Sequence, residues 1–324
     1  MTVPTDIPLG TRVVVRHRLP PGYSHPMTDV IGVLEAHEPV TVRTADDRTV
    51  QIAADRIVAV KALGARPVRT GEIRSLEVAA ALGWPGVESA WIGGWLARFG
   101  HGITGRANSA APLGMPGELA PFEEVADELR AWYSVRGQPL RLLLPDRLTS
   151  GSLPRPRDTD PVSVLAADIG DLVLPTGPAV SRVAAEPDSE WLARYPFRTG
   201  RRSAEIQVLS AIRGGELGFA RIGNAGAPPI AIGRAAITRA PDGRVWVGLS
   251  CVEVAAEHRR HGVGSLVCAE MIAWGRERGA THTYLQVTDD NAPALAMYRK
   301  LGLVEHHRYR YAVPVAADGR GDVE

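Results

Sequence analysis

The feature that most constrains the fold is a strand-like segment, followed by a basic loop with two glycines and then by a helix-like segment. The apolar stretch VWVGLSCVEV covers residues 245–254, the loop EHRRHGVGS covers 257–265, and SLVCAEMIAWGRERG covers 265–279. The last segment ends in Arg278 and Gly279, which are typical of a helix C-terminus. A strand that leads through a tight loop into a helix predicts an α+β domain at this end of the chain.

Further strands and helices surround this unit. The segments expected to be strands are 204–212, 215–223, 229–238, 244–254, 281–288 and 303–314. The segments expected to be helices are 189–197, 265–279 and 291–302. The turn APDG at 240–243 predicts that the two strands on either side of it form a hairpin.

The preceding part of the chain divides into two further regions. Residues 9–62 contain five short β-branched segments, at 11–19, 29–37, 39–45, 49–54 and 56–63, which predict a small SH3-like β-barrel. The second region is expected to form a helix at 72–83, strands at 89–100 and 102–111, a helix at 122–137, a strand at 140–146 and one or two strands within 163–175. The expected domains are 1–65, 66–178 and 179–314, followed by a flexible tail at 315–324.

Composition narrows the class of protein. With 324 residues, of which 45% are hydrophobic and 23% charged, the chain can form sizeable cores. Lys+Arg 37 against Asp+Glu 36 argues against nucleic acid as the main partner. Cys251 and Cys268 have no metal-binding spacing, and two buried thiols indicate a reducing compartment. The N-terminus has no secretory pattern and no apolar run reaches the length of a membrane span, so we expect a cytoplasmic protein without a membrane partner.

The loop 257–265 suits an anion. The first N–H groups of a helix have no intrahelical partner and carry the positive end of the helix dipole. Gly262 and Gly264 lack side chains, so backbone amides can approach an oxygen closely, and a pyrophosphate would suit this loop. The loop is not a P-loop, because no Lys-Ser or Lys-Thr follows the glycines. It is not a dinucleotide fingerprint either, because Val267 replaces the third small residue.

The sequence VEVAAEHRRHGVGSLV at 252–267 resembles the acetyl-CoA motif of the GCN5-related N-acetyltransferase (GNAT) superfamily, with Arg259, Gly262 and Gly264 in the motif positions. The stretch YLQVTDDNAPALAMYRKLGL at 284–303 resembles the last conserved block of the same superfamily. The resemblance covers about residues 180–314. It implies a GNAT fold, a mixed and mostly antiparallel sheet flanked by helices. It also implies direct transfer of an acetyl group from acetyl-CoA to a primary amine.

The stretch GGWLARFGHGITGRANSAAPLG at 93–114 resembles a narrower group of actinobacterial-type acetyltransferases. In that group the catalytic domain follows a degenerate acetyltransferase-like lobe and, in some members, an SH3-like barrel. No Arg-x-x-Gly-x-Gly loop occurs between residues 66 and 180. The resemblance therefore implies that the middle lobe does not bind acetyl-CoA.

The superfamily resemblance also implies roles for individual residues. The expected cofactor-binding residues around the CoA pyrophosphate are Arg259, Arg260, His261, Gly262, Val263, Gly264 and Ser265. The backbone around Val252 and Val254 would pair with the pantetheine arm, and an N–H near Val254 would polarise the thioester carbonyl. Asn291 would bond the CoA arm, and Tyr298 would protonate the departing thiolate as a general acid.

The general base is not defined by this resemblance. Some members of the superfamily carry Glu at the position of Gln286, and a glutamine side chain cannot act as a base. Glu253 is a nearby carboxylate. Strand alternation places it on the face opposite Val252 and Val254, unless a β-bulge turns it inward. A chain of waters or a carboxylate from the middle lobe are the alternatives.

Three functions remain open at this point. The first is an acetyl-CoA-dependent N-acetyltransferase that acts on a small amine, and the second is an acetyltransferase that acts on a protein N-terminus or lysine. The third is a CoA-binding sensor or nucleic-acid-tethered regulator without catalysis, which the near-neutral charge of residues 9–62 does not favour. No metal site is expected from the histidine pairs His258/His261 and His306/His307. The indoles of Trp84, Trp91 and Trp95 are expected in the core or in an acceptor pocket between lobes.

Overall fold

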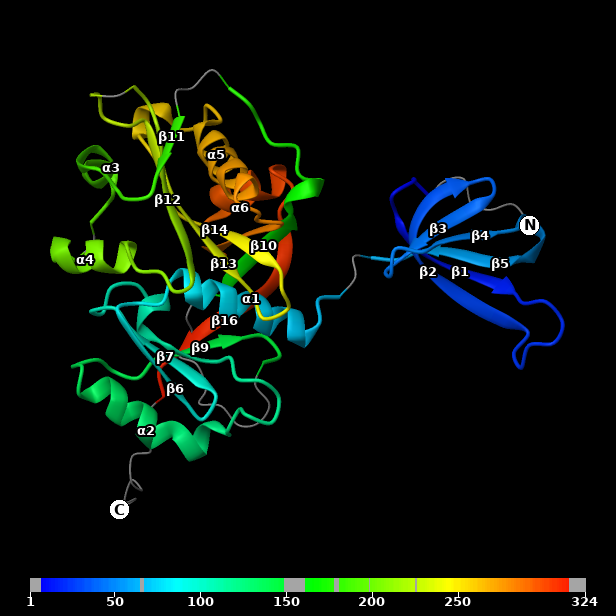
Figure 1. The fold of residues 1–324 in the computed structure, drawn as a ribbon, viewed down its shortest axis with the longest axis horizontal. Helices are drawn as coiled ribbons and strands as arrows, with labels where there is room; N and C mark the ends of the chain where they lie inside the picture. Colours follow the sequence, from blue (N-terminus) through cyan, green and yellow to red (C-terminus); the bar gives the residue numbers. More distant parts are fainter. Residues whose placement is uncertain are drawn as a thin grey trace, which may run out of the picture. The chain divides into compact units, whose positions relative to one another are not determined.

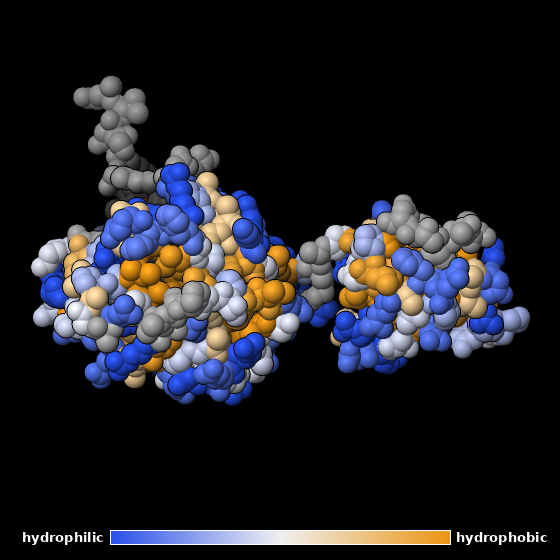
Figure 2. Space-filling model, turned by 90° about the horizontal axis from the view of Figure 1, so that it is seen from above, coloured by the Kyte–Doolittle hydropathy of each residue, from blue (hydrophilic) through white to orange (hydrophobic). Residues whose placement is uncertain are grey.

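The computed structural model describes residues 7–64, 67–148, 161–177, 181–197, 199–224 and 226–314 (Figure 1). The chain forms two compact units, Met1–Pro67 and Val68–Glu324. The tail expected at 315–324 lies outside the described residues. Within the described part of the chain, no helix is long and apolar enough to span a membrane. Figure 2 shows hydrophobic residues in patches among hydrophilic ones on the surface of each unit.

The first unit is a five-stranded antiparallel sheet with the order β4-β3-β2-β1-β5. Its elements are β1 (Arg12–Arg18), β2 (Met27–His37), β3 (Val40–Thr44), β4 (Thr49–Ile52), the 3-10 helix η1 (Ala54–Arg56) and β5 (Ile57–Ala62). Alternate residues such as Val13 and Val15 point into the core, as the period of two in a strand requires. The five strands expected from the sequence are all present, whereas the SH3-like closure of the barrel stays a prediction.

The second unit contains one mixed sheet of eleven strands in the order β11-β12-β13-β14-β15-β10-β16-β9-β8-β7-β6 (Figure 1). Its strands are β6 (Glu88–Ile92), β7 (Trp95–Phe99), β8 (Ala110–Pro112), β9 (Leu142–Pro145), β10 (Val162–Asp168), β11 (Ser181–Ala184), β12 (Gly215–Ile222), β13 (Ala231–Arg239), β14 (Val245–Val254), β15 (His282–Thr288) and β16 (Val304–Ala312). The helices are α1 (Thr70–Gly83), α2 (Phe122–Ser134), α3 (Ser189–Arg194), α4 (Arg202–Leu209), α5 (Val263–Glu277) and α6 (Ala292–Lys300), with short 3-10 helices η2 (Arg106–Asn108), η3 (Ile169–Asp171) and η4 (Ala256–His258).

Two parallel strand pairs give this unit an internal repeat. β14 and β15 are parallel and are joined through α5, while β8 and β9 are parallel and are joined through α2. The helix starts differ, however. The first turn of α2 carries Glu123 and Glu124, whereas that of α5 has no acidic residue. Acidic side chains at a helix N-terminus disfavour a bound anion, so α2 is a poor counterpart of α5 for holding a phosphate.

β10 ties the two halves of the second unit together. It lies between β15 and β16 in the sheet, although it precedes both of them by more than a hundred residues in the sequence. Strands from both sides of the expected boundary at residue 178 therefore share one sheet. The boundary itself stays a prediction.

The faces of the sheet near β13 and β14 are covered by different helices. Ala231, Ala235 and Ile237 of β13 share a core with α5 and α6. Residues of opposite parity face the other way, where Thr238 donates a hydrogen bond to the Ala79 carbonyl of α1 at 2.9 Å. Helices therefore pack on both faces of this part of the sheet, with α5 and α6 on one face and α1 on the other.

Three sequence expectations about this unit are wrong. The segment 89–100, expected to be one strand, forms the antiparallel pair β6 and β7. The segment 204–212, expected to be a strand, begins within the helix α4. Its buried residues Glu205, Val208 and Leu209 have helical spacing, and the two apolar ones pack against Trp191 in a separate core. The segment 102–111 is mainly a loop that contains η2 and leads into β8, because Asn108 bonds the backbone of Gly100, Gly102, Ile103 and Thr104.

Candidate active site

The site forms where β14 and β15 separate. Their parallel pairing runs from Trp246 opposite His282 to Leu249 opposite Leu285 and stops there. Beyond that point β14 continues beside β13 alone, and β15 continues beside β10. The gap leaves one edge of residues 250–254 without a neighbouring strand. A substrate chain with amide groups can add to such an edge by backbone hydrogen bonds.

The backbone of Val254 faces this gap. The N–H of Ala255 donates to the Ile230 carbonyl at 2.8 Å, on the β13 side. Because successive N–H groups of a strand point to opposite edges, the N–H of Val254 points toward β15, and that of Val252 does the same. These are the two positions at which the sequence predicted pairing with the pantetheine arm and an N–H for the thioester carbonyl.

A β-bulge in β14 orients Glu253. Ile232 pairs with Glu253 and Arg234 pairs with Ser250, so β14 has one more residue than β13 between these pairs, and Cys251 has a φ of 53°. The bulge keeps Val252 and Val254 against the α5 core. Glu253 then lies on the face opposite Val252 and Val254, as strand alternation predicted, and shares that face with Ser250.

The loop after β14 prepares the start of α5. Arg260 and Gly262 have φ angles of 63° and 78°, in the left-handed region, and Gly262 is the N-cap of α5. No side chain caps the helix, and the N–H of Leu266 donates to the carbonyl of the N-cap residue Gly262 at 3.1 Å. Arg259 donates from Nε to the Val254 carbonyl at 3.1 Å, which fixes the loop against the strand. The exposed loop therefore presents uncapped helix amides to solvent, as anion binding requires.

Gly264 has a packing role that the motif alone did not indicate. A Cβ at this position would lie 2.8 Å from Sδ of Met297 on α6, so the glycine allows α5 and α6 to pack closely. Asn291 begins α6, and its Oδ1 accepts a hydrogen bond from the Ala294 N–H at 3.2 Å. Its expected bond to the CoA arm stays a prediction.

Tyr298 lies in the core between α5 and α6. It is 8% exposed and shares that core with Val263, Val267 and Cys268 of α5. Burial raises the pKa of Tyr298 far above the ordinary value of a phenol, and the nearby Cys268 and Glu253 raise it further. The phenol is therefore neutral at physiological pH and can donate a proton.

The opposite face of the gap holds a small cavity of about 20 Å³. Its lining includes Gly248 and Ser250 of β14, Gln286 of β15, and Trp84 and Arg106 from the middle region of the chain. Arg106 donates from Nη1 to Oε1 of Gln286 at 2.6 Å. The position at which some relatives carry a glutamate therefore holds an amide that is already bonded to a guanidinium.

A second arginine, Arg234, also lines this cavity. Arg234 of β13 is 1% exposed and donates to the carbonyl oxygens of Leu209, Gly83 and Ala211. Its guanidinium lies over the Trp84 ring at 4.5 Å. Burial lowers the pKa of Arg234 to about 10, so it stays charged at neutral pH. Sequence reasoning missed both arginines, because Arg234 lies in no motif and the resemblance of the stretch 93–114 gave no role to Arg106.

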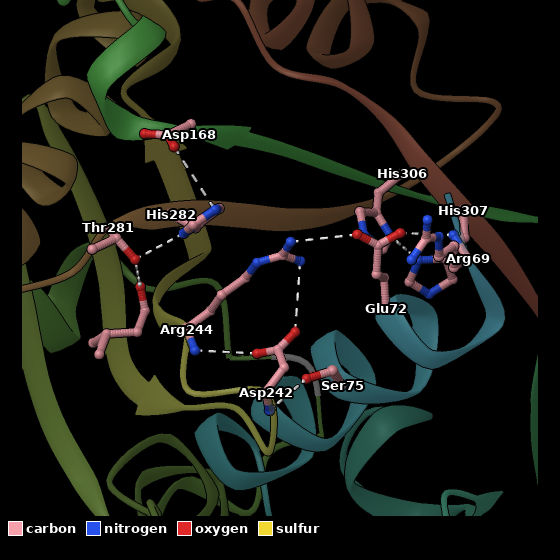
Figure 3. A network of polar contacts seen from close by, with 11 residues as sticks. Arg69, Glu72, Ser75, Asp168, Asp242, Arg244, Thr281, His282, His306 and His307 are labelled. Atoms are coloured by element: carbon pink, nitrogen blue, oxygen red, sulfur yellow. Dashed lines mark hydrogen bonds and ion pairs between the residues drawn. The ribbon is translucent and has the colours of Figure 1, made fainter. Parts of the chain in front are cut away.

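Among the described residues, no group of three or more His, Cys, Asp or Glu side chains is placed to hold a metal ion. Neighbouring residues of a strand normally point to opposite faces, but the Nδ1 atoms of His306 and His307 lie 2.8 Å apart (Figure 3). A bulge opposite Val164 and Leu165 adds the extra residue that brings the rings together. Burial and the neighbouring ring lower the pKa of His306 to about 4, and His307 bonds the buried Glu77 at 2.9 Å. This cluster joins α1 to β16.

Comparisons with known proteins agree with this geometry. Residues 70–312 match the family described as the C-terminal part of the probable histone acetyltransferase Rv0428c, and residues 7–61 match its N-terminal Sm-like domain. The chain is 39% identical over 311 residues to the probable histone acetyltransferase Rv0428c of Mycobacterium tuberculosis, and the match covers 94% of each chain. It is 25% identical over 253 residues to the uncharacterized N-acetyltransferase YobR of Bacillus subtilis, covering 74% of this chain and 98% of that one.

A solved structure of a GCN5-related N-acetyltransferase from Kribbella flavida is 18% identical, with a TM-score of 0.48, and covers 75% of this chain and 96% of that chain. The protein is an N-acetyltransferase of the GNAT superfamily. Within that class, the chain belongs to the Rv0428c family.

Proposed function

We propose that the protein transfers the acetyl group of acetyl-CoA to the primary amine of a small molecule. The observation that carries the proposal is the gap between β14 and β15, with an uncapped helix start beside it and a buried tyrosine on one face. The amides of the loop and first turn around Gly262 would hold the pyrophosphate. The Val252 and Val254 backbone would pair with the pantetheine amides, and the N–H of Val254 would stabilise the oxyanion.

The two faces of the gap would divide the chemistry. The acceptor nitrogen would attack the thioester carbon from the cavity face, forming the C–N bond, and the C–S bond would then break. Tyr298, on the α5 face, would give its proton to the departing sulfur. The proton lost by the amine would pass on the cavity face to Glu253, directly or through water.

The walls of the cavity favour a small acceptor over a peptide. Trp84 follows α1 and Arg106 lies in η2, so two backbone segments of the middle region cover Gln286. A small amine would enter once the Arg106 side chain turns away from Gln286. A peptide would have to displace the backbone of these segments, which Arg234 anchors through Gly83. A protein acceptor is the second candidate, because a relative is named as a probable histone acetyltransferase.

The test is thiol release from acetyl-CoA with a panel of acceptors. We expect small diamines, amino sugars and amino acids to include a substrate whose kcat/KM is at least tenfold above that of lysine-containing histone-tail peptides. Faster turnover of the peptides would replace the proposed acceptor class with the second candidate. Acetyl-CoA binding without turnover of any acceptor would favour the non-catalytic sensor.

Replacing the carboxylate of Glu253 tests the proposed base. We expect Glu253→Gln to lower kcat/KM about 10²-fold at pH 7, a size typical of general base catalysis. The variant should gain rate at higher pH, because more of the acceptor amine is then deprotonated without help. The control is Glu124→Gln, an exposed glutamate in the first turn of α2 outside the proposed site, which should behave as wild type. A normal pH profile in Glu253→Gln would assign the base elsewhere.

A further inference from the structure

A second cavity, of about 580 Å³, lies away from the proposed active site. Four segments form its walls: α1, the turn between β6 and β7, the loop after β8, and the turn between β13 and β14. That last turn precedes β14, whereas the anion-binding loop follows it. Because β14 has 10 residues and a strand rises about 3.3 Å per residue, the two sites lie at opposite ends of a strand that is about 30 Å long.

The lining of this cavity is mainly apolar. Val78, Leu113, Trp91 and Met115 contribute side chains, and the last two are 56% and 54% exposed although both are large and hydrophobic. Exposed apolar side chains that border a concave surface are typical of a ligand site. The volume is also within the range of about 300–1,000 Å³ that small-molecule pockets occupy.

One charge in the wall has no counter-ion among the residues that the structure describes. Arg74 shares a face of α1 with Gly71, Ser75 and Val78, and it is only 9% exposed. Within the described part of the chain, its Nε is buried without a hydrogen-bond partner, and no ion pair of its guanidinium is found. A buried charge without a counter-ion costs folding free energy. Such a cost is tolerated where a ligand supplies the opposite charge.

The two carboxylates in the wall are engaged elsewhere. Asp242 accepts a hydrogen bond from the Arg244 N–H at 3.1 Å and lies 3.6 Å from its guanidinium, while its own N–H donates to Oγ of Ser75 (Figure 3). Glu118 accepts from the Met115 N–H at 3.3 Å, within its own loop. Among the charged side chains of this mainly apolar lining, Arg74 is therefore the one with a buried nitrogen that has no hydrogen-bond partner within the described residues.

We propose that this cavity binds an amphipathic monocarboxylate, with its apolar body among Val78, Trp91 and Met115 and its carboxylate on the guanidinium of Arg74. Arginine suits this role because its planar fork bonds both carboxylate oxygens. The proposal does not depend on the acetyl-transfer reaction. It adds a second ligand site to the half of the sheet that has no acetyl-CoA motif.

Calorimetric titration of the full chain with decanoate, 1-decanol and decylamine tests the proposal, and naphthylacetate tests an aromatic carboxylate. We expect decanoate or naphthylacetate to bind at least tenfold more tightly than 1-decanol, and which of the two binds better identifies the kind of apolar body. In Arg74→Met, the preference for the carboxylate over 1-decanol should vanish. Without ligand, Tm should stay equal or rise, because an uncompensated charge is removed.

Two further variants keep the test decisive. Arg130→Met removes a guanidinium on α2 that pairs with Asp127 outside the cavity, and it should bind decanoate as wild type does. Val78→Trp should fill the cavity and weaken all the probes together. The proposal is overturned if no probe binds at millimolar concentration, if decylamine binds best, or if Arg74→Met keeps the carboxylate preference.

Discussion

Replacing Tyr298 with phenylalanine is expected to lower kcat by about 10²- to 10³-fold while leaving the Kd of acetyl-CoA unchanged. The phenol supplies the proton for the leaving thiolate, and loss of a general acid costs a factor of this size. Burial holds the pKa of Tyr298 well above that of a free phenol, so the group remains protonated throughout the usual assay range. The fall in kcat should therefore be the same from about pH 6 to pH 9.

A buried tyrosine elsewhere separates this role from a packing effect. Tyr133 on α2 is fully buried, and its hydroxyl bonds the backbone of Arg98 at 3.0 Å and 3.1 Å. Tyr133→Phe should lose stability, by about 1 kcal/mol for the lost hydrogen bonds, but keep its kcat. If Tyr298→Phe instead keeps kcat, or loses acetyl-CoA affinity in parallel with kcat, Tyr298 is not the proton donor. Calorimetry gives the Kd, and thiol release gives kcat.

The parts of the fold that local pattern determines were predictable from sequence. The strand, loop and helix around residues 245–279 follow from apolar periodicity, the two glycines and the helix C-terminus, and the structure confirms these elements. The segment 204–212 failed because alternating apolar residues over so short a stretch fit either structure. Packing against Trp191 stabilises the helical form of this segment. Because that contact is tertiary, the local sequence does not indicate it.

The features that shape the active site are mostly long-range. The position of β10 between β15 and β16 depends on pairing with residues more than a hundred positions away. Arg106 lies 180 residues before its partner Gln286, and no local pattern indicates that they meet. The bulge at Cys251 was foreseen only as a condition, because an extra residue in one strand is defined by the register of its neighbour.

These long-range contacts change the interpretation of the role of Gln286. The sequence alone left the base undefined, because the resemblance implies that some superfamily members carry a glutamate at this position. With Arg106 bonded to its amide, Gln286 serves instead to join the middle region to the strand that borders the gap. The cavity that an acceptor would enter is thus built from both halves of the second unit. The base would then come from Glu253 of β14, on the strand face that also carries Ser250.

Introducing a negative charge at the start of α5 is expected to abolish acetyl-CoA binding. In Gly262→Glu, a carboxylate would occupy the N-cap, beside the uncapped amides proposed to hold the pyrophosphate, and we expect the Kd to rise at least 100-fold. The positive φ of 78° would cost about 1–2 kcal/mol for any residue with a Cβ. A carboxylate near the helix N-terminus offsets part of that cost through the dipole, so the fold should persist.

Gly279 provides the matched control at the other end of the same helix. It follows α5 with a φ of 85°, and a Cβ there meets no atom within 4 Å, as is also true at Gly262. Gly279→Glu therefore carries the same backbone strain and the same charge, but at the negative end of the dipole, where a carboxylate destabilises the helix. Gly279→Glu should be the less stable variant and yet bind acetyl-CoA normally, whereas Gly262→Glu should be the more stable one and fail to bind.

Calorimetry for binding and thermal unfolding for stability separate the two effects, and Gly262→Ala measures the strain without the charge. Normal affinity in Gly262→Glu would contradict a pyrophosphate at this loop, because no arrangement of the helix amides could then serve both anions.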